Sequence, residues 1–223
     1  MRQFIRIHPN SSHLLRVTLI HYLLDMPDLC FASTNIDDPA LLASVAFTDT
    51  RAWLEQAVIG LNLCPFAKAV YSKRQIRYCL SSARDTDTLF NTLCDELQLL
   101  AAAAPEEIDT TLLIHPEVLG NFTEYNDFLA IADTTIRNFG LEGQIQIASF
   151  HPEYQFDNSY PDDIENYTNR SPYPMLHLLR EQSIARAVSG IEDADEIVER
   201  NMKTLRLLGK DGWEALPFVV RRK

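Results

Sequence analysis

Between residues 76 and 150 the sequence alternates segments of β-strand type with segments of helical period. The strand-type segments cover 76–81, 110–114 and 145–150, and each is short and bounded by polar or turn-forming residues. The segments between them carry leucine and aromatic residues at the spacing of an amphipathic helix. Parallel neighbouring strands need helical crossovers of this kind, so the order β-α-β-α-β predicts a small, mainly parallel sheet. Because strand order cannot be read from this pattern, a ferredoxin-like α+β fold with antiparallel neighbours is the alternative.

Further helical segments flank this core and complete a single α/β domain, which we place at residues 49–223. A helix entered through Asp49 or Thr50 is predicted by residues at helical spacing that begin with Trp53. After a long loop, Pro174 can occupy the first turn of a helix that runs to Val188. A last helix is predicted to end at a glycine, Gly209.

Residues 1–48 are interpreted as a poorly ordered N-terminal extension. The first 24 residues contain no acidic residue and three arginines, Arg2, Arg6 and Arg16. A secretory signal needs an unbroken apolar run and a small-residue cleavage site, and the interrupted stretch 14–24 offers neither. The alternatives are an amphipathic transit-like peptide and an extension upstream of Met26. No stretch approaches the ~20 apolar residues that a membrane span requires.

The composition restricts the class of partner and the compartment. A net charge of −11 argues against nucleic acid, because phosphate binding needs a basic surface. A local arginine cluster could still hold a small anion. The four cysteines form no C-x-x-C pair, and they are Cys30, Cys64, Cys79 and Cys94. Since nothing else suggests a secreted disulfide scaffold, we expect reduced cysteines and a cytoplasmic protein.

The segment 151–174 is too rich in aromatic residues for a disordered linker. Its aromatic residues are Tyr154, Phe156, Tyr160, Tyr167 and Tyr173. Disordered segments are depleted in such residues, and a connection of this length without regular structure is usually functional or disordered. We therefore expect an ordered loop that builds a site.

Polar side chains follow each of the three predicted strands. Ser81, His115 and His151 stand at the carboxyl ends of these strands. Ligands of open α/β sheets bind outside the carboxyl ends, so these residues are expected to meet at one edge. The loop leaves from the same edge, and the loop residues expected to fold over it are Asn166, Asn169, Arg170 and Ser171.

Several segments carry a resemblance to a known family. They are Asn62–Ala67 (NLCPFA), Leu113–Pro116 (LIHP), Phe150–Phe156 (FHPEYQF), Thr168–Glu181 (TNRSPYPMLHLLRE), and the pair Arg200-Asn201 before Leu208-Gly209. Over residues 50–216 the chain resembles the bacterial family known as domain of unknown function 1415. The resemblance implies a bacterial intracellular protein, and it implies no activity, cofactor or catalytic residue. The segment before Thr50 lies outside the resemblance, which favours its interpretation as an extension.

His151 and His115 are the candidate catalytic residues. An unperturbed imidazole titrates near neutrality, so small shifts of its pKa suit it to general acid or base catalysis. The structural alternative is that each ring ends a strand and hydrogen-bonds a neighbouring backbone carbonyl.

Arg170, Asn169, Arg180 and Ser171 are the candidate ligand-binding residues. A guanidinium group presents forked donors that match a carboxylate or phosphate. The alternatives are that Arg170 holds the loop by bonding its carbonyls, and that Arg180 pairs with Glu181 or Asp162.

A metal site is a weaker alternative. On the predicted helix over 175–188, His177 and Glu181 would lie one turn apart and could join His115 or His151. No dense ligand motif supports this arrangement, so no metal is assigned. Cys64 is not proposed as a nucleophile, because a position just beyond a helix C-terminus raises a thiol pKa. The signatures of nucleotide sites and serine hydrolases are absent from the sequence, and the cofactor is unknown.

Two classes of function remain. The first is an enzyme that acts on a small anionic metabolite, with histidine acid/base chemistry and an Arg170/Asn169 anion clamp. The second is a non-catalytic protein-interaction module that presents the loop 151–174. A metal-dependent enzyme using His177 and Glu181 is a further alternative. In an enzyme, the polar side chains of the loop should line a concave pocket. In a docking surface, the tyrosines of the loop should be exposed.

Overall fold

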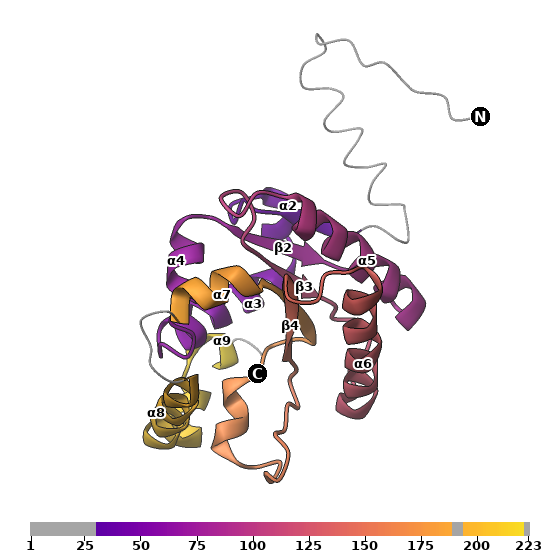
Figure 1. The fold of residues 1–223 in the computed structure, drawn as a ribbon. Helices are drawn as coiled ribbons and strands as arrows, with labels where there is room; N and C mark the ends of the chain where they lie inside the picture. Colours follow the sequence, from indigo (N-terminus) through magenta and orange to yellow (C-terminus); the bar gives the residue numbers. More distant parts are fainter. Residues whose placement is uncertain (1–29, 189–193, 221–223) are drawn as a thin grey trace, which may run out of the picture.

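The computed structural model describes residues 30–188 and 194–220. These residues form one five-stranded sheet in the order β1-β2-β3-β5-β4. The strands are β1 (Phe31–Ser33), β2 (Ile76–Leu80), β3 (Thr110–Ile114), β4 (Ile145–Phe150) and β5 (Met175–Arg180). Figure 1 shows α5 and α6 on one side of the sheet and α3, α4 and α7 on the other.

The central β-α-β unit forms as the sequence predicts. β2 and β3 are parallel, and they are joined through α5 (Thr86–Ala102). Asp85 caps α5 by accepting a hydrogen bond from the backbone N–H of Thr88, which satisfies one of the unpaired donors at the helix start. All of β3 is buried, as expected for a strand that is covered on both faces.

The prediction of a mainly parallel sheet is wrong, although the α/β class holds. Residues 175–180 form the strand β5 instead of the first turns of a helix, and β5 pairs antiparallel with both β3 and β4. The edge strand β1 is also antiparallel to its neighbour β2. The order of core elements, β-α-β-α-β-β, differs as well from the β-α-β-β-α-β order of the ferredoxin-like alternative.

β2, β3 and β4 nevertheless share one direction. β3 and β4 are each antiparallel to β5, so they run the same way with β5 between them. Their connection is α6 (Phe122–Asn138), which is capped by Asn121 and followed by Gly140 at a φ of 67°. The expectation that His115 and His151 lie at the same edge of the sheet is therefore confirmed.

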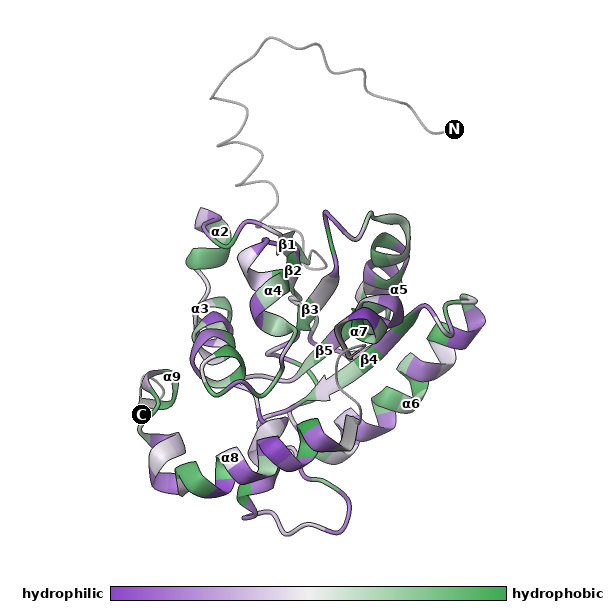
Figure 2. Cartoon of the chain, turned by 60° about the vertical axis from the view of Figure 1, so that its left-hand side comes forward, coloured by the Kyte–Doolittle hydropathy of each residue, from purple (hydrophilic) through white to green (hydrophobic). Residues whose placement is uncertain are grey.

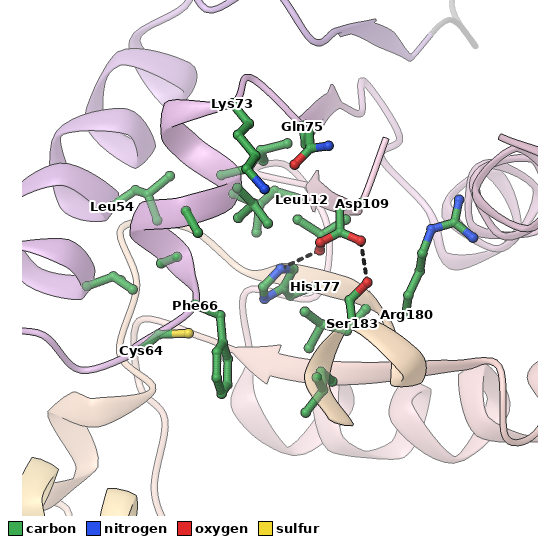
Figure 3. A pocket seen from close by; sticks show the side chains of 18 of the residues that line it. Leu54, Cys64, Phe66, Lys73, Gln75, Asp109, Leu112, His177, Arg180 and Ser183 are labelled. Atoms are coloured by element: carbon green, nitrogen blue, oxygen red, sulfur yellow. Dashed lines mark hydrogen bonds between the residues drawn. The ribbon is translucent and has the colours of Figure 1, made fainter. Parts of the chain in front are cut away.

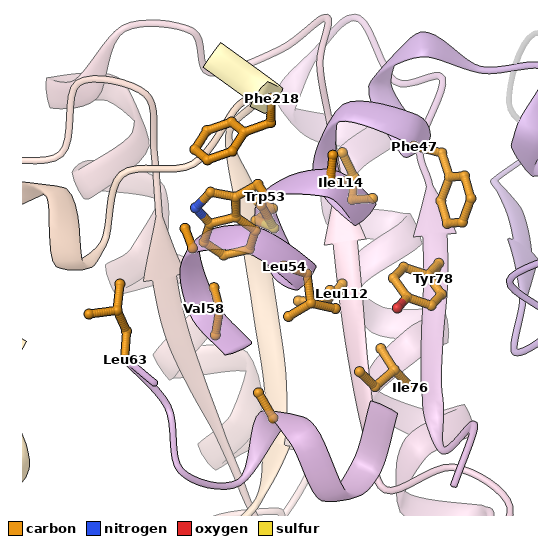
Figure 4. Close-up of a cluster of buried hydrophobic side chains, with 14 of the residues drawn as sticks. Phe47, Trp53, Leu54, Val58, Leu63, Ile76, Tyr78, Leu112, Ile114 and Phe218 are labelled. Carbon is orange, nitrogen blue, oxygen red and sulfur yellow. The ribbon is translucent and has the colours of Figure 1, made fainter. Parts of the chain in front are cut away.

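Two hydrophobic clusters cover the two faces of the sheet. On one face, leucines of α5 and aromatic residues of α6 pack against the sheet. On the other, Trp53, Leu54 and Val58 pack over Leu112 and Ile114 of β3 (Figure 4). Figure 2 shows hydrophilic and hydrophobic residues alternating around α6, as expected for a helix with one buried face.

The helix predicted from Asp49 begins earlier and changes type. α3 (Val45–Trp53) is capped by Ser44 and continues as the π-helix η1 (Leu54–Ile59). The Gly60 N–H bonds the Glu55 carbonyl at 3.0 Å, which is the i→i−5 pattern of a π-helix. A Cβ at position 60 would lie 2.2 Å from the Gln56 carbonyl oxygen, so this turn requires glycine. π-helical turns occur frequently at functional sites.

The loop after β4 is ordered by its own hydrogen bonds. It contains the 3-10 helix η2 (Ile164–Thr168). Asn166 is fully buried there and bonds the Phe156 N–H at 3.0 Å and the Tyr160 carbonyl at 2.8 Å. The helix α8 (Ala194–Glu214) packs against η2, with an ion pair between Arg206 and Glu165.

The remaining helical segments are short. They are α2 (Pro39–Leu42), α4 (Ala67–Ser72), α7 (Glu181–Val188), which follows β5 directly, and α9 (Pro217–Val220). α8 bends at Gly209, where φ is 67°, close to the predicted end of the last helix. Within the described residues, no helix is long and apolar enough to cross a membrane.

Residues 30–48 belong to the packed structure, contrary to the expectation that they pack poorly. They form β1, α2 and the first residues of α3, and the side chains of Leu41 and Phe47 are fully buried. The sequence pattern missed this because each segment is short and gains its stability from burial against distant elements. Residues 1–29 lie outside the described residues, and the domain boundary itself stays a prediction.

The expectation that all cysteines are reduced is also wrong for one pair. Cys30 and Cys79 form a disulfide with a Cα–Cα distance of 6.0 Å, and Cys64 and Cys94 are free. The sequence hides this pair because its 49-residue separation is closed by the β1–β2 pairing.

We predict that Leu41→Ala lowers the free energy of unfolding by about 2–5 kcal/mol, because it removes a fully buried side chain and leaves a cavity. Leu42→Ala is the matched control, since Leu42 is 42% exposed, and it should change stability by about 0.5 kcal/mol or less. Urea unfolding at equilibrium measures both. Equal small losses would show that residues 30–44 are an appendage.

Candidate functional site

A cavity of about 620 Å³ lies between the sheet and the helices on the Trp53 side (Figure 3). Its apolar wall includes Leu54, Val58, Phe66, Val70, Leu112 and Phe150. Its polar wall includes Lys73, Gln75, Asp109, Thr110, His177 and Ser183. A concave, largely apolar cavity of this size with a few polar groups is typical of a small-molecule site.

The polar residues gather where β2 and β3 begin and β5 ends. Lys73 and Gln75 precede β2, Asp109 precedes β3, and Ser183 lies in α7 after β5. Because β5 is antiparallel to β3, its carboxyl end lies beside the amino end of β3. The polar end of the cavity is therefore at the opposite edge from the carboxyl ends of β2 and β3.

His177 is held in one tautomer on the cavity wall. The Thr110 hydroxyl donates to the Leu178 carbonyl at 2.6 Å, so at 2.7 Å it accepts a hydrogen bond from Nε2–H of His177. Nδ1 is then unprotonated, and within the described residues no hydrogen bond to Nδ1 is found. Burial lowers the pKa of His177 to about 4, so its ring is neutral at physiological pH.

A second polar group lies beside His177 in the cavity. The Ser183 hydroxyl donates to Asp109 Oδ1 (Figure 3). Arg186 donates to the same hydroxyl at 3.0 Å. These contacts join the start of α7 to the segment before β3. The cavity therefore contains a carboxylate and a hydroxyl beside the His177 ring.

Lys73 brings a positive charge to the cavity. It is an exposed residue at the end of α4, and its side chain points toward His177 and Asp109 in Figure 3. No ion pair of Lys73 is found within residues 30–188 and 194–220. The ammonium group is thus free to meet an anion.

Cys64 also lines this cavity. The sequence predicts that it follows the end of a helix, and in the structure it also lies shortly before the start of α4. The backbone N–H groups of Phe66 and Ala67 bond its sulfur. Burial nevertheless raises the pKa of the Cys64 thiol. Because a nucleophilic cysteine needs a lowered pKa, Cys64 is not proposed as a nucleophile.

His115 and His151 do not line this cavity. Both are fully buried and both contact the ring of Tyr125, at centroid distances of 6.0 and 5.1 Å. His115 Nδ1 donates to the Val118 carbonyl at 3.0 Å, and His151 Nε2 donates to the Leu119 carbonyl at 3.1 Å. These two hydrogen bonds attach the turn that contains Val118 and Leu119 to the ends of β3 and β4. His115 Nε2 has no hydrogen-bond partner within the described residues.

Arg170, Asn169 and Ser171 bond the backbone around the loop. Arg170 donates to the Tyr154 and Pro161 carbonyls at 3.2 and 2.6 Å, and its guanidinium lies 4.4 Å from the Tyr167 ring centroid. Asn169 donates to the Ser149 carbonyl at 3.0 Å. Ser171 donates to the Tyr173 carbonyl at 2.6 Å. The roles assigned to these residues in ligand binding stay predictions.

Arg180 lines the cavity but uses its guanidinium to cap a helix. It donates to the Leu100 and Ala103 carbonyls at the end of α5 and to the Ile108 carbonyl. A cation at this position satisfies unpaired carbonyls and offsets the helix dipole.

The arrangement of His177 and Glu181 on one helix is wrong, because His177 lies in β5 and Glu181 begins α7. Of the described residues, the group with three metal-ligating side chains within reach of one ion is Cys30, Cys79 and Glu96. It lies on the other face of the sheet from His177.

The sequence pattern missed Lys73, Asp109, Thr110 and Ser183 as residues of one site. Thr110 begins β3 and the other three stand shortly before or after a strand, and that position is the available signal. The rule that ligands bind at the carboxyl ends of the strands points to the opposite edge of the sheet. The antiparallel insertion of β5 is what brings Ser183 to the amino end of β3.

Comparison with known proteins gives one match. A family model described as protein of unknown function (DUF1415) matches residues 45–215. No curated protein and no solved structure matches the chain.

We predict that His115 makes folding sensitive to acid. Burial lowers its folded pKa to about 4 from an unfolded value of about 6.5. The stabilisation from the neutral ring is complete above pH 6.5 and is lost as the pH falls toward 4, by on the order of 3 kcal/mol. Urea unfolding at several pH values measures the loss. His115→Asn keeps a donor for the Val118 carbonyl but cannot titrate, so it should show a smaller loss. An unchanged pH dependence would contradict the burial of a neutral His115.

We predict that Arg170→Lys lowers the free energy of unfolding by about 1–2 kcal/mol, because lysine lacks the fork that reaches both carbonyls. Arg206→Lys is the control, since the Arg206 side chain is 64% exposed and its pair with Glu165 should contribute little. Denaturant titration compares the variants. Full stability of Arg170→Lys would indicate that its guanidinium serves a ligand instead.

Proposed function

We propose that this chain, which belongs to the family described as protein of unknown function (DUF1415), is an enzyme acting on a small anionic metabolite; the cavity, and not the family match, supports the proposal. The substrate would occupy the cavity lined by Lys73 and His177. The observation that carries the proposal is the unprotonated Nδ1 of His177, whose tautomer is fixed by Thr110.

His177 is the proposed general base. A neutral imidazole has a lone pair ready to accept a proton, and Thr110 keeps Nε2 as the protonated nitrogen. Burial alone makes this base weak, because it lowers the pKa to about 4. An anion bound beside the ring would favour the imidazolium form and raise this pKa toward neutrality. The negative charge of the substrate would thus activate the base that acts on it.

Lys73 is the proposed anion-binding residue. It approaches the cavity from α4, whereas the side-chain N–H groups of Gln75 and the hydroxyl of Ser183 already donate within the fold. Charge-assisted hydrogen bonds to carboxylate or phosphate are roughly twice as strong as neutral ones. The side chains that the sequence predicts for this chemistry are bonded within the fold, and they are His151, His115, Arg170 and Asn169. His177 supplies an imidazole and Lys73 a positive charge, and both line a cavity.

The apolar wall of the cavity favours a substrate whose remaining portion is nonpolar. Leu54, Phe66 and Phe150 would contact a nonpolar portion, while the anion lies at the Lys73 end. Burying apolar surface contributes about 25 cal/mol per Å². A metabolite with one anionic group and a compact nonpolar body fits this division better than a polyanion.

Differential scanning fluorimetry against carboxylated and phosphorylated metabolites tests the binding step. A ligand present at about 100 times its Kd stabilises the fold by ~2.7 kcal/mol, which raises Tm by about 5–10 °C. Lys73→Met should weaken binding by about 10–100-fold. Lys68→Met is the matched control, because Lys68 lies on the same helix and outside the cavity lining. Equal shifts in the parent and Lys73→Met would refute the assigned anion site.

Incubation of the best ligand with the parent protein, followed by mass spectrometry, tests the chemical step. His177→Gln keeps a donor for Thr110 but provides no base, so turnover should fall by about 100-fold or more. Ligand affinity should change little. A ligand that binds tightly and is never converted would contradict catalysis and leave a binding protein.

Protein interaction through the loop 151–174 is the second candidate function. Tyr160 is 77% exposed, and exposed tyrosines are common in interface hot spots. The loop is also rigidly held by Asn166 and Arg170, as a preformed docking surface would be. Capture of a partner by the parent and not by Tyr160→Ala would favour this function.

A further inference from the structure

We propose that Cys30, Cys79 and Glu96 form a zinc site when the Cys30–Cys79 disulfide is reduced. Each residue offers one ligand atom, and these three atoms lie within 4.8 Å of one another. Thiolate and carboxylate groups are established ligands of Zn²⁺. The site lies on the α5 side of the sheet, so it is independent of the cavity and of the proposed enzymatic function.

The sheet and one helix bring the three ligands together. Ala32 is paired with Cys79, so Cys30, two residues before Ala32, projects on the same face as Cys79. Glu96 comes from the buried side of α5, which packs on this face. Cys79 is fully buried and Glu96 is 4% exposed, whereas Cys30 is partly exposed. The exposed side leaves room for a water molecule as the fourth ligand.

Reduction creates the spacing that zinc requires. Breaking the sulfur–sulfur bond forces the two sulfur atoms apart to van der Waals distance. Tetrahedral zinc with ordinary bond lengths holds its sulfur and oxygen ligands about 3.5–3.8 Å from each other. The separated sulfur atoms and the nearby Glu96 oxygen thus need only small rearrangements.

Arg77 supplies a positive charge that keeps the site neutral both with the disulfide closed and with zinc bound. Its guanidinium bonds both Glu96 oxygens, at 2.7 and 2.9 Å, and the pair is largely buried. With the disulfide closed, the Glu96 and Arg77 charges cancel. With zinc bound, the two thiolates and Glu96 carry three negative charges, which Zn²⁺ and Arg77 neutralise. Neither state leaves an uncompensated buried charge, which would be costly. Arg77 would also orient the carboxylate as an outer hydrogen-bonding partner of the ligand.

The exchange between the two states is a balanced reaction. A dithiol transfers two electrons and two protons to the Cys30–Cys79 bond and closes to its own disulfide. Zn²⁺ then displaces the two thiol protons as it binds. Oxidation of the thiolates by a disulfide compound reverses the sequence and releases the ion.

Zinc titration of the full chain, reduced with a phosphine, tests the proposal. Competition with a chromogenic chelator should show one Zn²⁺ per reduced chain and none for the oxidised chain. Replacement by Co²⁺ should give a thiolate-to-cobalt charge-transfer band in the near ultraviolet. Cys30→Ser and Glu96→Gln should each weaken binding by at least about 10–100-fold.

Cys94→Ser is the matched control. Cys94 is a free, partly exposed cysteine on α5, two residues before Glu96, and it lies outside the three-residue group. Its removal should leave the stoichiometry and affinity unchanged. Zinc binding that survives Cys30→Ser, or a reduced chain that binds no zinc, would overturn the proposal and leave Cys30–Cys79 as a structural disulfide only.

Discussion

The pairing of β5 with both β3 and β4 is the interaction on which the rest of the structure depends. Its backbone groups bond two strands at once, in a register that sets His177 opposite Leu112 and Ala148. Without β5, the facing edges of β3 and β4 would bury unpaired donors and acceptors, which is costly. The same insertion places α7 over the amino end of β3 and so brings Ser183 to Asp109. The cavity is a consequence of the sheet order.

The locally encoded parts of this fold could be predicted from the sequence. β2, β3 and β4 have strand patterns that need no knowledge of their neighbours, and Asp85 and Asn121 satisfy the first amides of α5 and α6. β5 could not be predicted in this way. Met175, Leu176 and Leu178 are good helix formers, and a proline precedes them. They form a strand because pairing on both edges outweighs their intrinsic preference.

The candidate site shows the same division between local and distant information. His115 and His151 do meet at one edge, because β3 and β4 run in the same direction. Their rings, however, bond the consecutive carbonyls of Val118 and Leu119, so a turn of the chain covers that edge of the sheet. The cavity lies at the other edge, because the carboxyl-end rule describes parallel sheets and β5 breaks that condition. The Cys30–Cys79 disulfide likewise depends on the distant pairing of β1 with β2, which no local sequence pattern indicates.

The proposed chemistry rests on one lone pair, the unprotonated Nδ1 of His177 at the cavity. Two-dimensional ¹H–¹⁵N correlation spectra of the imidazole side chains near neutral pH report the protonation of each ring nitrogen directly. With Thr110 fixing the tautomer and burial lowering the pKa, His177 should be neutral, with the proton on Nε2 and none on Nδ1. The tautomer is assigned by following the His177 signals and their loss in His177→Gln. A His177 ring protonated on Nδ1, or charged in the free protein, would contradict the general-base role.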